Sequence, residues 1–231
     1  MNRMYYFVKV SRTQKKGGVT MRKLLVSLVL TASVFFVSLV PTHGLAANST
    51  NEASSSSFSR NAKGEILHTV EKNETVSDIA IKYGVPLEDL KEKNGITSNS
   101  VIEGVTLVLP KTLTSQEKDL LARLVNAEAK GEPYKGKVAV ATVVLNRVDS
   151  SKFPNTVTGV INAKSQFSPV ANGSIKKKAT VEAKKAVNQA IALQETGTEA
   201  TFFYNPAKTT DRWIKSLKVV SKIGNHNFAI S

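Results

Sequence analysis

The sequence predicts an α+β protein, in which a small βααβ unit precedes a larger, mainly helical domain with a small β-sheet. Apolar residues recur at helical spacing within 115–130 and 180–194, whereas short runs of β-branched and aromatic residues occur near 66–70, 105–109 and 200–205. The 231 residues suffice for one medium domain and one small one. Because the chain has no cysteine, its core must hold without disulfides, and a cysteine nucleophile is excluded.

Residues 1–47 have the composition of a secretory signal peptide. Seven Lys and Arg side chains, with no acidic residue among them, precede an apolar run over 24–40, and the small residues Ala46 and Ala47 offer a cleavage site. We therefore expect an exported protein. An uncleaved membrane anchor and a start at Met21 are the alternatives.

The charge of the chain suits an anionic surface outside the cell. The formal net charge is +14, and about +7 remains once the leader is subtracted. Such a charge concentrates a protein at an anionic wall polymer or membrane surface. The alternative is that the charge only aids solubility. We expect no nucleic-acid partner, a monomer, and membrane contact only through an uncleaved leader.

Residues 48–65 are rich in Ser and Asn and are predicted to be a linker. The compact unit over 66–110 follows, with a strand, two helices and a closing strand. Thr75 or Ser77 can cap its first helix, and Gly84 can end that helix in the left-handed conformation.

This unit resembles a LysM module, the βααβ carbohydrate-binding unit of many wall enzymes. The resemblance rests on HTVEKNETVSDIAIKYGVPLEDLKEKNGI and VIEGVTLVLP, with His68 in place of the usual Tyr, and Asn73 and Glu74 in place of Gly and Asp. It implies a groove for N-acetylglucosamine chains lined by Glu74, Thr75, Val76, Asn94, Gly95 and Ile96. Thr75 as a helix cap, and Asn94 with Gly95 as a turn, are compatible structural roles.

The second domain, residues 111–231, begins with a long helix. Thr114 and Glu117 fit a capping box at its start, and Gly131 and Pro133 end it. The next apolar segment, 138–148, is a strand or a buried helix by pattern alone, and we choose a buried helix.

The later part of this domain is predicted to combine a helix with strands. An amphipathic helix covers 180–194, and 200–205 has strand character. We expect the tail after Trp213 to be irregular, with 219–220 as a possible partner strand.

Glu128 occupies an unusual position on the long helix. Leu121, Leu124 and Val125 follow the i, i+3, i+4 spacing of an apolar face, and Glu128 is the next member of that series. Removal from water raises the pKa of a carboxyl group, which keeps a proton available for a leaving group. Glu128 is therefore our candidate general acid, and a glutamate paired with Lys or Arg is the alternative.

Four motifs in the second domain resemble the cell wall hydrolase family that includes the spore cortex-lytic enzymes. They are LVNAEAKGEPYKGKVAVATVVLNRV, QFSPVANG, FFYNPAKTTDRWI and IGNHNF, and the resemblance spans 120–228. It implies a lysozyme-like fold and cleavage of the β-1,4 bond between N-acetylmuramic acid and N-acetylglucosamine. Glu128 corresponds to that family's catalytic glutamate.

A second catalytic carboxyl group is not evident. Glycosidases of the usual kind use two carboxyl groups, but Glu132, Asp211 and Glu199 have no secure spacing to Glu128. The resemblance suggests a lytic transglycosylase, in which one glutamate acts as acid and then as base while the 6-hydroxyl of muramic acid attacks. Hydrolysis by a muramidase stays open.

Further substrate contacts are expected from aromatic and polar residues in the motifs. Aromatic rings stack on sugars but are as often part of a core, and amide or imidazole groups bond acetamido or lactyl groups. The candidates are Gln166, Phe167, Tyr204, Asn205, Trp213 and His226. No cofactor or metal is expected, since no second His or Cys lies at ligand spacing from His226.

Two alternatives to this enzyme are kept. One is a catalytically inactive peptidoglycan-binding protein of the wall or spore coat. The other, an amidase or peptidase, would need a metal or a nucleophile, and the sequence supplies neither.

Overall fold

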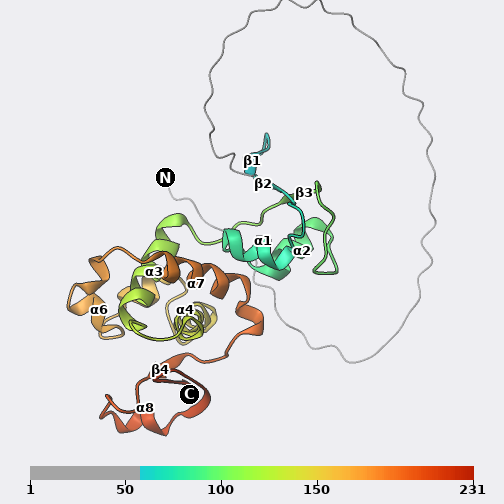
Figure 1. Cartoon of the computed structure of the whole chain (residues 1–231). Helices are drawn as coiled ribbons and strands as arrows, with labels where there is room; N and C mark the ends of the chain where they lie inside the picture. Colours follow the sequence, from blue (N-terminus) through green and yellow to red (C-terminus); the bar gives the residue numbers. More distant parts are fainter. Residues whose placement is uncertain (1–57) are drawn as a thin grey trace, which may run out of the picture. The chain divides into compact units, whose positions relative to one another are not determined.

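The computed structural model describes residues 58–231, which belong to one compact unit (Figure 1). The predicted signal peptide and most of the predicted linker lie outside the described residues. None of the helices formed by 58–231 has both the length and the apolar character that crossing a bilayer requires.

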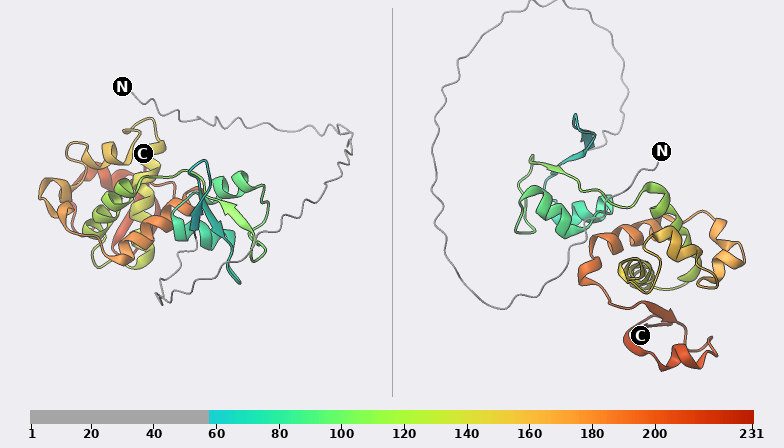
Figure 2. Two further views of the ribbon diagram at one scale, coloured as in Figure 1. Left: turned by 90° about the horizontal axis from the view of Figure 1, so that it is seen from above. Right: turned by 180° about the vertical axis from the view of Figure 1, so that it is seen from behind.

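The N-terminal module contains a three-stranded antiparallel sheet and two short helices (Figure 2). The elements are β1 (Phe58–Arg60), β2 (Ile66–Thr69), α1 (Val76–Tyr83), α2 (Leu87–Asn94) and β3 (Thr106–Val108). The predicted βααβ order is confirmed, but 58–60, assigned to the linker, form a strand that pairs with β2. Composition could not reveal β1, because its hydrogen bonds depend on a partner strand.

Local side-chain chemistry fixes the first helix as expected. The Thr75 hydroxyl accepts from the Asp78 backbone N–H, and the Asp78 carboxylate accepts from the Thr75 N–H, which forms a capping box. Gly84 ends α1 with φ of 58°. The apolar faces of both helices close over the sheet around the fully buried Ile79 and Leu90.

A group of helices around α4 forms most of the second domain. They are α3 (Ser115–Glu128), α4 (Tyr134–Asp149), α5 (Val157–Asn162), α6 (Ser168–Ala171) and α7 (Val181–Ala192), with single 3₁₀ turns at 174–176 and 194–196. Figure 1 shows α4 end-on, and it packs against α3, α5 and α7. The prediction of a buried helix for 138–148 is therefore confirmed, and the capping box of Thr114 and Glu117 starts α3.

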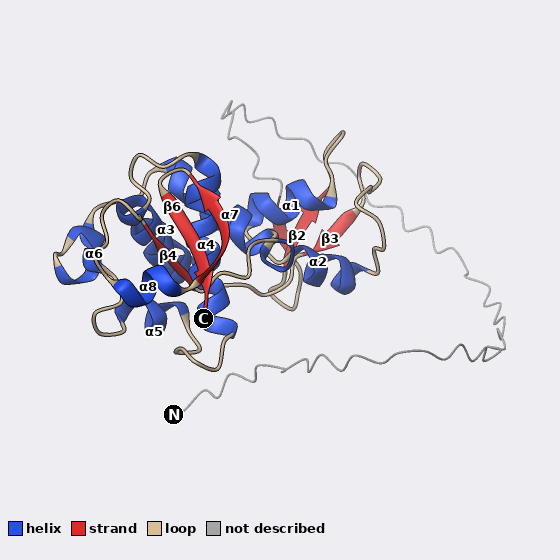
Figure 3. Ribbon diagram, turned by 90° about the horizontal axis from the view of Figure 1, so that it is seen from below, coloured by secondary structure: helices blue, strands red, loops and turns tan. Residues whose placement is uncertain are grey.

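The C-terminal segment forms a second antiparallel sheet (Figure 3). Its strands are β4 (Phe202–Tyr204), β5 (Lys218–Ile223) and β6 (His226–Ile230), in the order β4-β6-β5, and α8 (Arg212–Ser216) precedes β5. The expectation of an irregular tail was wrong, because β6 supplies hydrogen bonds to both β4 and β5. The α+β class is confirmed.

Candidate active site

Glu128 is the last residue of α3 and lies at the edge of the helical core. Leu121, Leu124 and Val125, which share its face, are fully buried, while Glu128 is half-buried. Within residues 58–231 its carboxyl group has no hydrogen-bond or ion-pair partner, so the alternative of a pairing with Lys or Arg finds no support. Burial alone raises the pKa of Glu128. A desolvated carboxyl group without a partner is suited to hold a proton and donate it.

Glu132 follows in the turn between α3 and α4, and its surroundings are the opposite. Its carboxylate is 7% exposed and accepts two hydrogen bonds from Asn225, one from the backbone N–H (2.9 Å) and one from Nδ2 (3.0 Å). Burial alone would raise the pKa of Glu132, but these bonds and the nearby charges of His226 and Lys208 lower it. Glu132 is thus an ionised acceptor that holds Asn225, which does not suit it to donate a proton.

The other two acids also lack the features of a partner for Glu128. The Asp211 carboxylate caps α8 by accepting from the backbone N–H groups of Trp213 (2.8 Å) and Ile214 (3.3 Å). Glu199 is exposed. Glu128 is consequently the one acid of the four that combines burial with an uncommitted carboxyl group.

His226 lies next to the Glu132 contact and is 8% exposed. Its Nδ1 is buried and has no hydrogen-bond partner among the described residues, and its ring meets the Phe203 ring edge-on at 5.3 Å. Burial lowers the pKa of His226, and the charge of Glu132 opposes this only in part. Because the side chain and its Nδ1 are covered, the contact of His226 with a sugar has no more support than that of Tyr204 and stays a prediction.

The three predicted aromatic contacts differ in exposure. Phe167 is 5% exposed and belongs to the core, and Tyr204 is 8% exposed, with its hydroxyl accepting from Asn227 Nδ2 (3.3 Å). Packing covers most of both rings, so the structure gives no support for their stacking on a sugar, and both contacts stay predictions. Trp213 is 56% exposed and rests edge-on against Phe202 at 5.4 Å. It stays a candidate platform for a sugar ring.

Arg147 is a prominent residue of this region that the sequence interpretation missed. Its guanidinium is buried and lies 5.0 to 5.4 Å from the ring centres of Phe153, Phe167 and Phe202. Its Nε donates to the carbonyl of Thr201 (2.7 Å), and burial lowers the pKa of Arg147 to about 10. The sequence did contain a sign of this role, because Arg147 is a charged residue within the otherwise apolar segment 138–148.

The two predicted amide contacts have partners within the protein. Gln166 is exposed, and its Oε1 accepts from Arg147 Nη1 (3.3 Å). Asn205 is half-buried, and its Oδ1 accepts from the Ala207 N–H (2.9 Å), which closes a turn. Within residues 58–231 the NH₂ groups of both side chains have no hydrogen-bond partner, so both contacts with a ligand stay predictions.

In the first loop of the LysM-like module, the predicted groove residues mainly hold the loop. Val76 is fully buried, so a contact of this residue with a sugar would involve its backbone and stays a prediction. Thr75 caps α1. The Glu74 carboxylate contacts Nε2 of the buried His68 (2.6 Å) and accepts from the Glu71 N–H (3.0 Å). His68 also contacts the Tyr83 hydroxyl through Nδ1, so the unusual histidine forms an internal network.

The second loop is similarly self-supporting. Asn94 Nδ2 donates to the carbonyls of Leu90 (2.8 Å) and Val108 (2.9 Å), and its Oδ1 accepts from the Val108 N–H. Gly95 has φ of 65°, and Ile96 packs against the module's core. These contacts confirm the turn and leave the sugar contacts as predictions.

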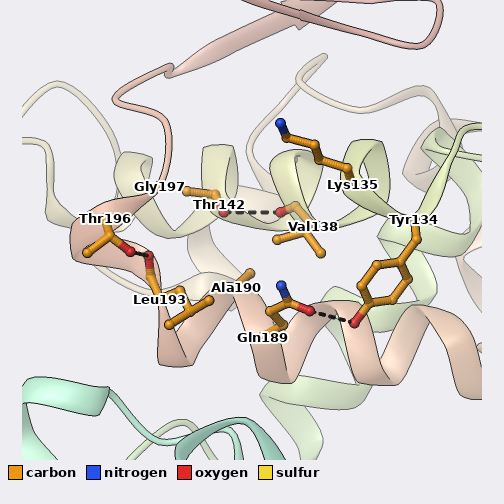
Figure 4. A pocket seen from close by; sticks show the side chains of 9 residues that line it. All are labelled: Tyr134, Lys135, Val138, Thr142, Gln189, Ala190, Leu193, Thr196 and Gly197. Atoms are coloured by element: carbon orange, nitrogen blue, oxygen red, sulfur yellow. Dashed lines mark hydrogen bonds between the residues drawn. The ribbon is translucent and has the colours of Figure 1, made fainter. Parts of the chain in front are cut away.

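A surface hollow of about 410 Å³ lies between α4 and α7 but contains none of the predicted site residues. Figure 4 shows its lining, in which the Tyr134 hydroxyl donates to Gln189 Oε1 (2.9 Å) and the Thr142 hydroxyl to the Val138 carbonyl. Glu128 is not part of it. Among residues 58–231, no group of three or more His, Cys, Asp or Glu side chains is placed to hold a metal ion.

Comparison with known proteins identifies both modules. Residues 131–229 match the Cell Wall Hydrolase family, and residues 68–110 match the LysM domain. The chain therefore carries a LysM module followed by a domain of the cell wall hydrolase family. The family match begins three residues after Glu128, so the role of that residue rests on its surroundings.

The chain is similar to spore cortex-lytic enzymes. It is 42% identical over 120 residues to the one from Bacillus cereus (52% of this chain, 46% of that protein) and 39% identical over 126 residues to the one from Bacillus subtilis strain 168 (54% and 41%). It thus spans less than half the length of these relatives. The crystal structure of the catalytic domain of the Bacillus cereus SleB protein aligns with a TM-score of 0.48 at 42% identity, covering 52% of this chain and 94% of that domain.

Proposed function

We propose that this protein cleaves peptidoglycan at the β-1,4 bond between N-acetylmuramic acid and N-acetylglucosamine, as a lytic transglycosylase outside the cell. Glu128 is the general acid and then the general base. The family of residues 131–229 and the curated relatives support a wall glycan as the substrate. The LysM module supports binding to the same polymer.

The observation that carries the mechanism is the contrast between Glu128 and the other acids. Glu128 is desolvated and has no partner among the described residues, whereas Glu132 and Asp211 are held by hydrogen bonds. Two-carboxyl glycosidases place a second, ionised carboxylate across the bond as nucleophile or base. In Glu132 both carboxylate oxygens already accept hydrogen bonds from Asn225. A mechanism with one carboxyl group fits this site better.

In the first step the protonated Glu128 donates its proton to the glycosidic oxygen as the bond from the anomeric carbon to that oxygen breaks. The resulting carboxylate then accepts the proton of the muramic acid 6-hydroxyl, while the oxygen of that hydroxyl bonds to the anomeric carbon. The product is a 1,6-anhydro end, and Glu128 regains its proton. The nucleophile is part of the substrate, which gives it a high effective concentration.

Replacement of Glu128 tests this role. We expect Glu128→Gln to lower the rate of wall or decoated-spore lysis by about 10²- to 10⁴-fold or more, because both proton transfers are lost. Glu199→Gln, an exposed acid in the same domain, is the matched control and should retain activity. Undiminished lysis by Glu128→Gln, with folding confirmed by circular dichroism, would contradict the proposal.

The pH dependence and the product ends test the mechanism further. Activity should fall as the pH rises through the raised pKa of Glu128, since the acid then loses its proton.

Product ends that borohydride cannot reduce indicate transglycosylation, and reducible ends indicate a muramidase. Tight binding without released fragments would favour the inactive wall-binding protein.

A further inference from the structure

The last turn of α1 is capped by side chains from outside the LysM module. A helix leaves its final carbonyl groups without partners inside the helix, and positive charge is favourable at that end. Here three consecutive carbonyls accept from donors later in the chain. The pairs are Asn188 Nδ2 to the Lys82 carbonyl (3.2 Å), Lys118 Nζ to the Tyr83 carbonyl (2.7 Å), and Thr112 Oγ1 to the Gly84 carbonyl (2.8 Å).

These donors come from two helices of the catalytic domain and from the segment that joins the modules. Lys118 lies in the first half of α3, Asn188 lies in α7, and Thr112 precedes α3. Helices α1 and α7 pack directly against each other. The capping groups therefore form one composite surface rather than a single chance contact.

Steric fit and apolar packing support the same surface. A Cβ added to Gly84 would lie 2.5 Å from Asn188 Oδ1 and 3.1 Å from Lys118 Nζ, so both side chains would have to shift to admit it. At the end of α7, Ala192 is 4% exposed and belongs to the core of the LysM module, and Leu193 packs beside it. The two modules thus share apolar as well as polar contacts.

Helix α3 connects this surface to the candidate active site. Lys118 and Glu128 lie on the same helix, separated by about 15 Å along its axis at 1.5 Å per residue. A module held by Lys118 is therefore held at a defined distance from the catalytic carboxyl group.

We propose that Thr112, Lys118, Asn188 and the end of α7 form a docking surface for the LysM module, which makes the module a fixed guide for the glycan strand instead of a mobile tether. The docking rests on the contacts above. The guiding of the strand toward Glu128 rests on the proposed function.

Hydrogen exchange on the full-length wild-type protein tests the docking without relying on a variant. If the module is docked, amides at the end of α1 should exchange through the same opening as amides in the middle of α3. Exchange in α1 that is faster than in α3 by a factor of about 100 would overturn the proposal, because it would show that the module opens alone.

A double variant tests the named residues. Lys118→Met with Asn188→Leu should speed exchange in α1 by about tenfold while exchange in α3 around Leu124 stays unchanged. Lys178→Met with Asn162→Leu makes the same chemical changes at exposed positions and should leave α1 as in the wild type. An unchanged α1 in the docking variant would contradict the role of these side chains.

Activity separates the docking from the proposed function. The docking variant should lose several-fold activity on long insoluble glycan but keep wild-type activity on short soluble fragments, which need no guide. Equal activity on both would refute the guiding role. If the wild-type protein were inactive on both substrates, the proposed function would be refuted. The exchange data would still decide whether the module is docked.

Discussion

Three glutamates show how the surroundings of a side chain decide its role. Glu128 is half-buried and has no hydrogen-bond or ion-pair partner in the described part of the chain, and burial raises its pKa. Burial also acts to raise the pKa values of Glu132 and Glu74. However, hydrogen bonds from Asn225 lower the pKa of Glu132, and hydrogen bonds from the Glu71 N–H and from His68 lower that of Glu74. The one carboxyl group that binds nothing internally is thus the one suited to proton transfer.

The unpartnered Glu128 should also make the wild-type protein less stable than a neutral variant. Because its pKa is higher in the folded than in the unfolded state, stability falls as the pH rises from the ordinary glutamate pKa through the raised one. We expect Glu128→Gln to raise the free energy of unfolding at pH 7 by about 1 kcal/mol, a usual size for a stabilising substitution. Urea titrations at pH 4 and pH 7 measure this, and the gain should be absent at pH 4. A Glu128→Gln variant less stable than the wild type at pH 7 would contradict the unpartnered state.

Periodicity revealed Glu128 because its face is defined by residues within two turns of the same helix. The contact of Glu132 with Asn225 joins residues far apart in the sequence, so no local pattern could separate an anchor from a second catalytic acid. The burial of Phe167 likewise involves a residue far away in the sequence, Arg147, whose guanidinium lies 5.2 Å from the centre of its ring.

At the scale of elements, the β5–β6 turn is attached to the helices by one carboxylate. Gly224, with φ of 57°, begins this turn, and an added Cβ would collide with the Glu132 carboxylate. Asn225 then donates both of its N–H groups to that carboxylate. Glu132 therefore ties the hairpin to the segment between α3 and α4.

Loss of this tie should lower stability. Glu132→Gln keeps one acceptor oxygen but faces the second Asn225 donor with an NH₂ group, so we expect a cost of about 1–3 kcal/mol in the free energy of unfolding at pH 7. Since the folded-state pKa of Glu132 is lowered, the wild-type advantage should vanish as the pH falls through that value. Urea titration measures the cost, with the exposed Glu195→Gln as control. Equal stability of the Glu132 variant and the control would refute the tie.

The elements that the sequence predicted are those fixed by neighbouring residues. Thr114 with Glu117 and Thr75 with Asp78 form capping boxes within four residues, and Gly84 ends α1 by its own conformation. Strand β5 was predicted only at 219–220 and β6 was missed, because β6 forms its hydrogen bonds with both β4 and β5. The pairing of strands from distant segments cannot be predicted from a short stretch of sequence.

For the whole molecule, the boundary between the modules runs through shared packing. Sequence composition divides the chain near Pro110, yet Ala192, far beyond that point, lies in the core of the LysM module. Lys118 is part of the same junction, where burial lowers its pKa from the ordinary 10.5 to about 8. The junction thus contains a cation that is costly to bury and that the Tyr83 carbonyl stabilises in part.

This buried cation predicts a distinct dependence of stability on pH. Between about pH 8 and 10.5 the folded protein releases the Lys118 proton while the unfolded chain still holds it, so this group makes the protein more stable as the pH rises. Lys118→Met removes the titration, and the stability of the wild type relative to this variant should therefore increase from pH 7.5 to pH 10. Urea titrations of both proteins at the two pH values measure the change, and Lys178→Met, at an exposed position, should follow the wild type. A constant difference between wild type and Lys118→Met would mean that Lys118 is solvated, and the junction around it open.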